Sequence, residues 1–316
     1  MRRAQWLTAA ALVLASAAAC TSGTPGATHA PIAHPPLTSA AALAVVRHYD
    51  DTIDAALDAK SPARLETLET GTALATSDAD RLFATAARPA STWRHTPAHE
   101  QIYLSPQSTY PQWFVSTFPY ADDEGRTEFS VFQRDQPGGQ WLKSVRTMST
   151  AHVLSSPVVT NGAVEEASPP ELARAKTAVA DLIRYIQTGS DRGTLTDVML
   201  AQNDAELFWA RLHLNSDWES GKATCYVNPH SLFVTMRTRD GAVETLGSIT
   251  CTYVLEARPG NSVDLPPSAR TWGITRLKGV PGYTYDDEKQ FVLSMSRDGS
   301  AKVIGYSYAT VSEQLI

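Results

Sequence analysis

Three groups of neighbouring polar residues have the types and spacing that chemistry requires. Trp93–His95 and His99–Glu100 combine imidazoles with a carboxylate, which suits general acid–base catalysis. His48–Asp51 offers metal ligands, but on the helix expected there these side chains lie away from the apolar stripe and form a solvated face. Asp122–Gly125 offers carboxylates for calcium, but these residues are also typical of a turn between two strands. A structural role is the simpler explanation in each case, so we assign no catalytic residue and no metal ligand.

The motifs of the common enzyme and nucleotide-binding classes are absent. The sequence contains no HExxH, no P-loop, no G-x-S-x-G and no G-x-G-x-x-G. It also lacks a C-x-x-C pair, so neither zinc binding nor thioredoxin-like chemistry is indicated. A net charge of -6 and a pI near 5.8 argue against nucleic-acid binding, which usually needs a basic face. We therefore predict no cofactor and no nucleic-acid partner.

Aromatic side chains are the second kind of candidate, because concave ligand pockets are mostly apolar with a few polar groups. The same side chains could instead fill the space between helices and a sheet, which is the simpler explanation. The pocket interpretation names Trp93, His95, Trp113, Trp209, Trp218 and Trp272.

The first residues predict export from the cytoplasm. Arg2 and Arg3 precede an apolar stretch from Trp6 to Ala15, which is shorter than the roughly 20 residues of a membrane span and therefore indicates a signal peptide over 1–19. Three alanines before Cys20 resemble the lipobox of bacterial lipoproteins. That resemblance implies acylation of Cys20 and lipid anchoring on the extracytoplasmic face of the cell membrane. The alternative is an ordinary secretory signal with Cys20 left free.

The lipobox-like match has one departure, since Ala17 stands where such boxes usually carry Leu, Val or Ile. Residues 20–38 are rich in Thr, Pro, Ala and Gly and have no amphipathic period, so we predict a flexible tether.

Cys225 and Cys251 lie in strand-like segments, and outside the cytoplasm two such cysteines are most simply a disulfide. A tight hairpin at Asp240-Gly241 would place Cys251 opposite His230 instead of Cys225. The disulfide therefore needs a longer loop, a bulge or a chain that doubles back at Asn228-Pro229. Two separately buried thiols are the alternative.

An internal repeat organises the remaining chain. Ser77–Ala84 aligns with Asn203–Ala210, and both begin with a helix N-cap residue followed three positions later by an acid. An amphipathic helix precedes each segment, around Ala42–Leu57 and Leu172–Ile186. The second helix is opened by a capping box at Ser168–Glu171.

Strand signals follow the helices in each half. They cover Thr127–Gln133 and Trp141–Val145 in the first half, and Lys289–Met295 and Lys302–Tyr308 in the second. A Pro- and Gly-rich insertion is expected around Arg258–Tyr285. Helices followed by antiparallel strands indicate the α+β class. We predict two tandem repeats, each a helical layer packed on a curved antiparallel sheet.

This arrangement resembles the nuclear transport factor 2-like cone, also called the SnoaL-like or cystatin-like fold. Two such domains behind a lipobox resemble uncharacterised actinobacterial lipoproteins. The resemblance implies a first cone domain at 39–155, a linker at 156–167 and a second cone domain at 168–316. With 316 residues and 43% apolar residues, the chain is long enough for two cores.

These features predict a non-catalytic binding or interaction module whose partner is an envelope protein or a small hydrophobic ligand. The alternative is a cone-fold enzyme that acts on a small hydrophobic molecule through a buried Asp or His. Such an enzyme would need an ionisable group with a strongly perturbed pKa deep in one cone. The sequence indicates neither the ligand nor the oligomeric state.

Overall fold

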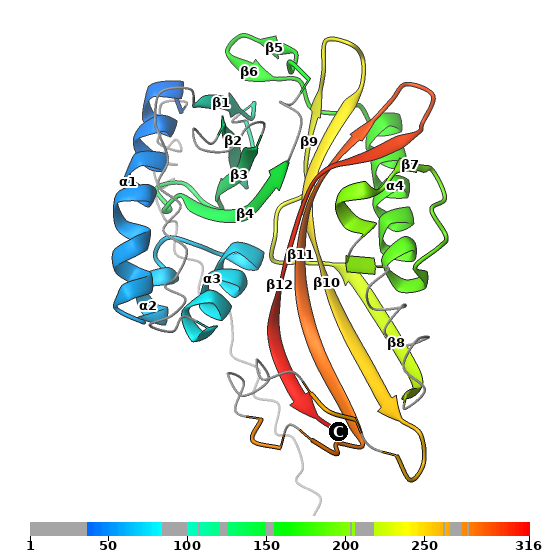
Figure 1. Cartoon of the computed structure of the whole chain (residues 1–316). Coiled ribbons are helices and arrows are strands. Elements are labelled where there is room, and N and C mark those ends of the chain that lie inside the picture. The colour runs from blue at the N-terminus through cyan, green and yellow to red at the C-terminus, as the bar shows by residue number, and fades with distance from the viewer. Residues whose placement is uncertain are drawn as a thin grey trace, which may run out of the picture. The chain divides into compact units, whose positions relative to one another are not determined.

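Helices followed by antiparallel strands occur twice along the chain (Figure 1). The computed structural model describes residues 37–83, 100–106, 108–119, 126–149, 155–202, 204–205, 218–261, 263–265, 274–276 and 278–316. Residues 36–316 form one compact unit. The combination of helices with mainly antiparallel sheets confirms the predicted α+β class.

The N-terminal half begins with helices and ends in a four-stranded meander. The helices are α1 (Ser39–Asp58), α2 (Pro62–Leu65) and α3 (Gly71–Phe83). The strands are β1 (Gln101–Leu104), β2 (Gln112–Pro119), β3 (Thr127–Arg134) and β4 (Leu142–Ser149), paired antiparallel in that order. The predicted apolar stripe of α1 is buried and packs against Phe114 and Phe132 of the sheet.

The C-terminal half contains a longer sheet. It opens with a small hairpin of β5 (Val159–Thr160) and β6 (Ala163–Val164), within the segment predicted as a linker, and continues with α4 (Pro169–Thr188). The remaining strands are β7 (Leu195–Asp197), β8 (Trp218–Val227), β9 (Val234–Arg237), β10 (Val243–Ala257), β11 (Gly282–Met295) and β12 (Ala301–Leu315). Their order is β7-β12-β11-β10-β8, and β9 also pairs with β10.

The ends of α4 follow from its sequence. The backbone N–H of Ser168 donates to the Glu171 carboxylate at 2.8 Å, and Pro169 occupies the first helical position, as predicted. Gly189 ends the helix with a φ of 70°, a left-handed conformation that glycine adopts without a side-chain clash.

The predicted strand segments fall within β3, β4, β11 and β12 apart from Trp141, but the strands of the second half are longer than expected. β11 begins at Gly282, so the prediction that Gly282–Tyr285 belongs to an insertion is wrong. Tyr283 instead pairs with Leu255 of β10. The Pro- and Gly-rich composition of the preceding residues concealed where the strand begins, because strand formation there depends on pairing with β10.

The predicted disulfide joins Cys225 of β8 to Cys251 of β10, which lie directly opposite each other. Val227 pairs with Ile249, whereas Val234 of β9 pairs with Leu246. The six-residue connection 228–233 between these strands therefore loops out and shifts the register. Of the alternatives, the structure adopts the excursion of the chain that begins at Asn228-Pro229, and the hairpin loop between β9 and β10 contributes little to the shift.

The two sheets share a hydrophobic core. Trp113, Val115 and Val131 of the first sheet belong to the same buried cluster as Leu246 and Val292 of the second. On the other face of the second sheet, Phe291 packs in a separate cluster with residues of α4. Because neighbouring side chains on a strand point to opposite faces, β11 is covered on both sides.

Both halves also contain a short parallel pairing to their last strand. Glu69 forms a parallel bridge with Lys143 of β4, and β7 pairs in parallel with β12 at Leu195 and Ala301. The separation between Glu69 and Leu195 equals that between Ser77 and Asn203, which begin the segments aligned by the sequence repeat. A short parallel pairing to the last strand is thus a feature that the two halves share.

Candidate functional site

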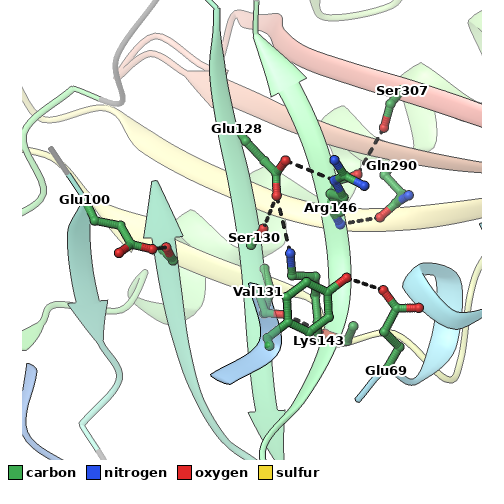
Figure 2. Close-up of polar contacts among 12 residues, drawn as sticks. Glu69, Glu100, Glu128, Ser130, Val131, Lys143, Arg146, Gln290 and Ser307 are labelled. Carbon is green, nitrogen blue, oxygen red and sulfur yellow. Dashed lines mark hydrogen bonds and ion pairs between the residues drawn. The ribbon is translucent and has the colours of Figure 1, made fainter. Parts of the chain in front are cut away.

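The N-terminal half buries a lysine beside carboxylates and an aromatic ring (Figure 2). Lys143 Nζ lies 3.3 Å from Glu128 Oε1 and 3.8 Å from the ring centre of Tyr49. Arg146 Nε lies 2.9 Å from the second oxygen, Glu128 Oε2, and the Ser130 hydroxyl donates to Oε1 at 2.7 Å. Two cations and a hydroxyl thus compensate the buried Glu128 carboxylate.

A second carboxyl in this half is held differently. The Tyr49 hydroxyl donates to Glu69 Oε1 at 2.5 Å. Burial raises the pKa of Glu69 above its usual value, although the hydroxyls of Tyr49 and Ser77 and the charge of Lys143 oppose the rise. Burial also raises the pKa of Tyr49 well above its usual value, and the charge of Glu69 adds to that rise. Both groups therefore favour the protonated form.

The C-terminal half contains a comparable buried lysine on β11. Lys289 Nζ lies 2.7 Å from Asp204 Oδ2 and 3.0 Å from Asp287 Oδ2. The Tyr306 hydroxyl donates to Asp204 at 2.5 Å, and the Thr310 hydroxyl donates to Asp287 at 2.8 Å. These contacts give both aspartates a cation and a hydroxyl donor.

The ionisation of this group follows from burial and charge together. Burial alone would lower the pKa of Lys289, but Tyr306, Asp287 and Asp204 raise it well above its usual value. Burial raises the pKa of Asp287, and Lys289 opposes that rise. The lysine therefore remains an ammonium at neutral pH.

Five tyrosines share the face of the sheet that carries Lys289. Side chains alternate along β11, so Tyr283 and Tyr285 lie on the same face as Lys289. Three tyrosines of the neighbouring strands lie on this face as well, because each pairs with a β11 residue whose side chain points to it. We call this set, Tyr253, Tyr283, Tyr285, Tyr306 and Tyr308, the tyrosine face. The rings of Tyr253 and Tyr285 stack with their centres 4.7 Å apart and an angle of 11° between their planes.

Apolar clusters border the tyrosine face at both ends. Tyr306 and Tyr285 pack against the cluster that contains the buried residues of α4, and Tyr283 belongs to a cluster with Trp218 and Leu265. Figure 1 shows that β10, β11 and β12 extend well beyond α4. Tyr308 remains 50% exposed, whereas Tyr253 is buried. Tyr283 is also buried, and Tyr285 and Tyr306 are partly buried, so the face combines mostly buried rings with a polar centre and exposes Tyr308 at its edge.

The described residues contain no group of three or more His, Cys, Asp or Glu side chains that could hold a metal ion. Among the same residues, no helix combines the length and the apolar character that crossing a membrane requires.

A family model described as "Domain of unknown function (DUF8094)" matches residues 33–314, which is most of the chain. The chain belongs to the DUF8094 family. The match includes both the buried lysines and all five residues of the tyrosine face. No curated protein matches the chain, and no solved structure matches it.

The aromatic residues predicted for a pocket are only partly described in this DUF8094 chain. Trp113 is buried in the core between the two sheets, and Trp218 is buried beside the segment that follows β10. Core filling, the alternative interpretation, therefore describes both positions. Trp93, His95, Trp209 and Trp272 lie outside the described residues, as does Cys20.

Among the described residues, the other polar groups predicted from the sequence make no contact with Lys143 or Lys289. His48 and Asp51 are exposed on α1, as expected for a solvated face, and Asp122–Gly125 lies outside the described residues. Glu100 is the member of its group that the structure describes, and it accepts a hydrogen bond from Ser116 at 3.2 Å (Figure 2).

Sequence reasoning did not identify the buried lysines. The sequence pattern predicts a strand that starts at Lys289, whereas the charged run Asp286–Gln290 lies in the middle of β11. Charged residues are rarely buried without partners, so a charged run within a strand signals a buried ionic group if both faces are covered. That coverage was not visible in the sequence, because it comes from α4 on one side and the N-terminal half on the other.

Proposed function

We propose that this chain is an extracytoplasmic lipoprotein that binds its ligand on the tyrosine face without catalysing a reaction. The observation that carries the proposal is the arrangement of five tyrosine rings around the Lys289 ion pairs, among which the ring of Tyr308 is 50% exposed. The ion pairs fix the polar centre, because both aspartates are held by a buried cation. The ring of Tyr308, which is 50% exposed, then lies at the edge of a preorganised surface.

The location outside the cytoplasm is supported by the disulfide between Cys225 and Cys251, since such bonds persist in oxidising compartments. The sequence before Cys20 supports a lipid anchor at that residue. Metabolic labelling with an alkyne analogue of palmitate should mark the wild-type chain in cells that process lipoproteins. Label that persists in the Cys20→Ser variant would overturn the anchor.

We also propose that the two halves are repeats of one cone-like unit, divided at residues 156–167. The matching parallel pairings at Glu69 and Leu195 support this division, and so does the shared order of helices followed by antiparallel strands.

The binding site can be tested by a thermal-shift screen with neutral sugars, amines, fatty acids and aromatic compounds. Compounds that bind the tyrosine face should raise the melting temperature of the wild type and of Tyr226→Ala but not of Tyr308→Ala. Tyr226 is the matched control, because it is 51% exposed on the same sheet but its pairing with Thr250 places it on the opposite face. A screen in which every stabilising compound acts equally on Tyr308→Ala would refute the proposed site.

Catalysis in the N-terminal half is the second candidate function. It is favoured by Glu69, which is 2% exposed, has a raised pKa and contacts the Tyr49 hydroxyl. A buried carboxyl of this kind can carry a proton at neutral pH and act as a general acid. Any turnover found with a small-molecule substrate should then be lost in Glu69→Gln and retained in Glu66→Gln, whose side chain is exposed.

A further inference from the structure

Lys289 and Asp204 come from distant parts of the chain, and the fold holds their side chains as close as two reacting groups. Lys289 Nζ lies 2.7 Å from Asp204 Oδ2, and the lysine side chain is 0% exposed. An amine held against a carboxyl group can reach an effective concentration of about 10⁵ M or more. Burial also keeps bulk water away from the amine, which favours condensation over hydrolysis. These are the conditions under which two side chains condense to an amide.

Asp287 is placed to carry the protons that such a condensation moves. Its Oδ2 atom lies 3.0 Å from Lys289 Nζ, and the side chain is buried. Burial raises the pKa of Asp287, so this carboxyl accepts a proton from the ammonium more readily than an exposed aspartate does. The Tyr306 hydroxyl donates to Asp204 Oδ2 at 2.5 Å and thereby stabilises negative charge on the group that is attacked.

We propose that Lys289 and Asp204 form an intramolecular isopeptide bond after the chain has folded, with Asp287 as the proton carrier. Asp287 takes a proton from the Lys289 ammonium and passes it to the Asp204 carboxylate. The neutral amine then attacks Asp204 Cγ, so that the Nζ–Cγ bond forms and one Cγ–O bond breaks. Asp287 relays a proton from Nζ to the departing hydroxyl, which leaves as water. One ammonium and one carboxylate thus become one amide and one water, and no other reactant is consumed.

The charges of the group make this reaction slow but favourable. The ammonium form of Lys289 predominates at neutral pH, so the amine is present in a small fraction of chains at any moment. That fraction is sufficient, because the bond forms once per chain and its formation removes two buried charges. Asp287 stays beside the new amide and keeps the centre of the tyrosine face polar. The inference is therefore independent of the proposed binding function.

The bond joins β11 to the segment that precedes β8, so the loop that it closes contains β8, β9 and β10. The disulfide between Cys225 and Cys251 lies within this loop. A reductant opens the disulfide but not an amide, so the second sheet keeps one covalent link under reducing conditions.

The buried lysine of the N-terminal half provides an internal comparison. Lys143 Nζ lies 3.3 Å from Glu128 Oε1, but Arg146 Nε lies 2.9 Å from Glu128 Oε2. This second cation favours the ionised form of Glu128, and a carboxylate anion resists attack by an amine. We therefore expect one isopeptide bond in the chain.

Intact-mass spectrometry of the full chain, reduced and compared with its variants, tests the bond. After correction for the substituted side chain, the wild type should be lighter than Lys289→Arg by one water molecule, because a guanidinium stays protonated and does not attack a carboxyl group. Lys302→Arg is the matched control, since Lys302 is exposed on β12, and it should show the same loss as the wild type. Peptide mapping should then find a product that joins Lys289 to Asp204.

Two further variants test the assigned roles. Asp204→Asn should release ammonia instead of water and reach the same final mass as the wild type, because both routes give the same amide. Asp287→Asn should leave most chains unlinked, because an amide side chain does not carry protons and general acid–base catalysis contributes about a hundredfold or more. Circular dichroism establishes that each variant is folded.

A wild-type chain that retains the full mass of its residues would overturn the inference, whether or not any variant folds. Loss of water that maps to another site, such as a succinimide at Asp240-Gly241, would also overturn it. So would a bond between Lys289 and Asp287, because the proton carrier would then be the reacting group.

Discussion

Glu244 should make the folded state less stable as the pH rises, and its replacement by glutamine should remove that effect. The side chain lies on β10 and is 1% exposed. Neither carboxyl oxygen has a hydrogen bond of normal geometry, although Ser155 and Ser294 face the group. Burial raises the pKa of Glu244 from 4.5 to about 8, and the charge of Asp240 adds to the rise.

The sign of the effect follows from proton linkage. Between pH 4.5 and about pH 8 the native state keeps a proton on Glu244 that the unfolded state releases. Stability therefore falls as the pH rises through this range. Each pKa unit corresponds to about 1.4 kcal/mol, so the loss reaches about 3 kcal/mol at neutral pH and about 5 kcal/mol above the native pKa.

Glu244→Gln should be more stable than the wild type by about 3 kcal/mol at neutral pH, because the amide resembles the protonated carboxyl in size and remains neutral. The two proteins should have similar stability below pH 4.5, where the carboxyl is protonated in both states. Urea denaturation at several pH values measures the difference. Other carboxyls, including Glu69 and Asp287, change the curves of both proteins equally and cancel in the comparison.

Glu219→Gln is the matched control, because Glu219 is exposed on β8. This variant should follow the wild type at every pH. A Glu244→Gln variant that is less stable than the wild type at neutral pH, or whose stability difference does not change with pH, would refute the reasoning. That result would mean that the Glu244 carboxylate is ionised and compensated in the native state.

Three further changes test other parts of the structure. Gly71→Ala should lower the free energy of unfolding by at least about 2 kcal/mol, because the φ of Gly71 is +55° and a Cβ there would lie 2.5 Å from a serine hydroxyl oxygen. Gly138 has a similar φ of +70° but open space around it, so Gly138→Ala should lower the free energy of unfolding by only about 1 kcal/mol. Urea denaturation measures both values. Lys289→Met should cost about 3–5 kcal/mol, since it leaves two buried aspartates without their cation, and a small change would show that the aspartates are neutral or hydrated. Replacing Cys225 and Cys251 by serine should cost about 3–4 kcal/mol for a separation of 26 residues, and equal stability of the wild type with and without reductant would contradict this.

Local patterns were sufficient for the helices and several turns. The apolar period of α1 and the Ser168–Glu171 capping box identified two helices, because both signals act between residues within about one helical turn. The α+β class followed from the order of these elements along the chain. The ends of strands are harder to predict from the sequence, as Gly282–Tyr285 shows, because a strand forms only where a partner strand continues beside it.

The sequence by itself thus determined the α+β class, the positions of the main helices and the pair of cysteines available for a disulfide. Only the tertiary structure decided which side chains meet. Tyr253, Tyr285 and Tyr308 come from three different strands, and only the register of β10, β11 and β12 places them on one face with Lys289. The physical reason is that helix caps and periodicity depend on close neighbours along the chain, whereas register and burial depend on strands that are distant in sequence.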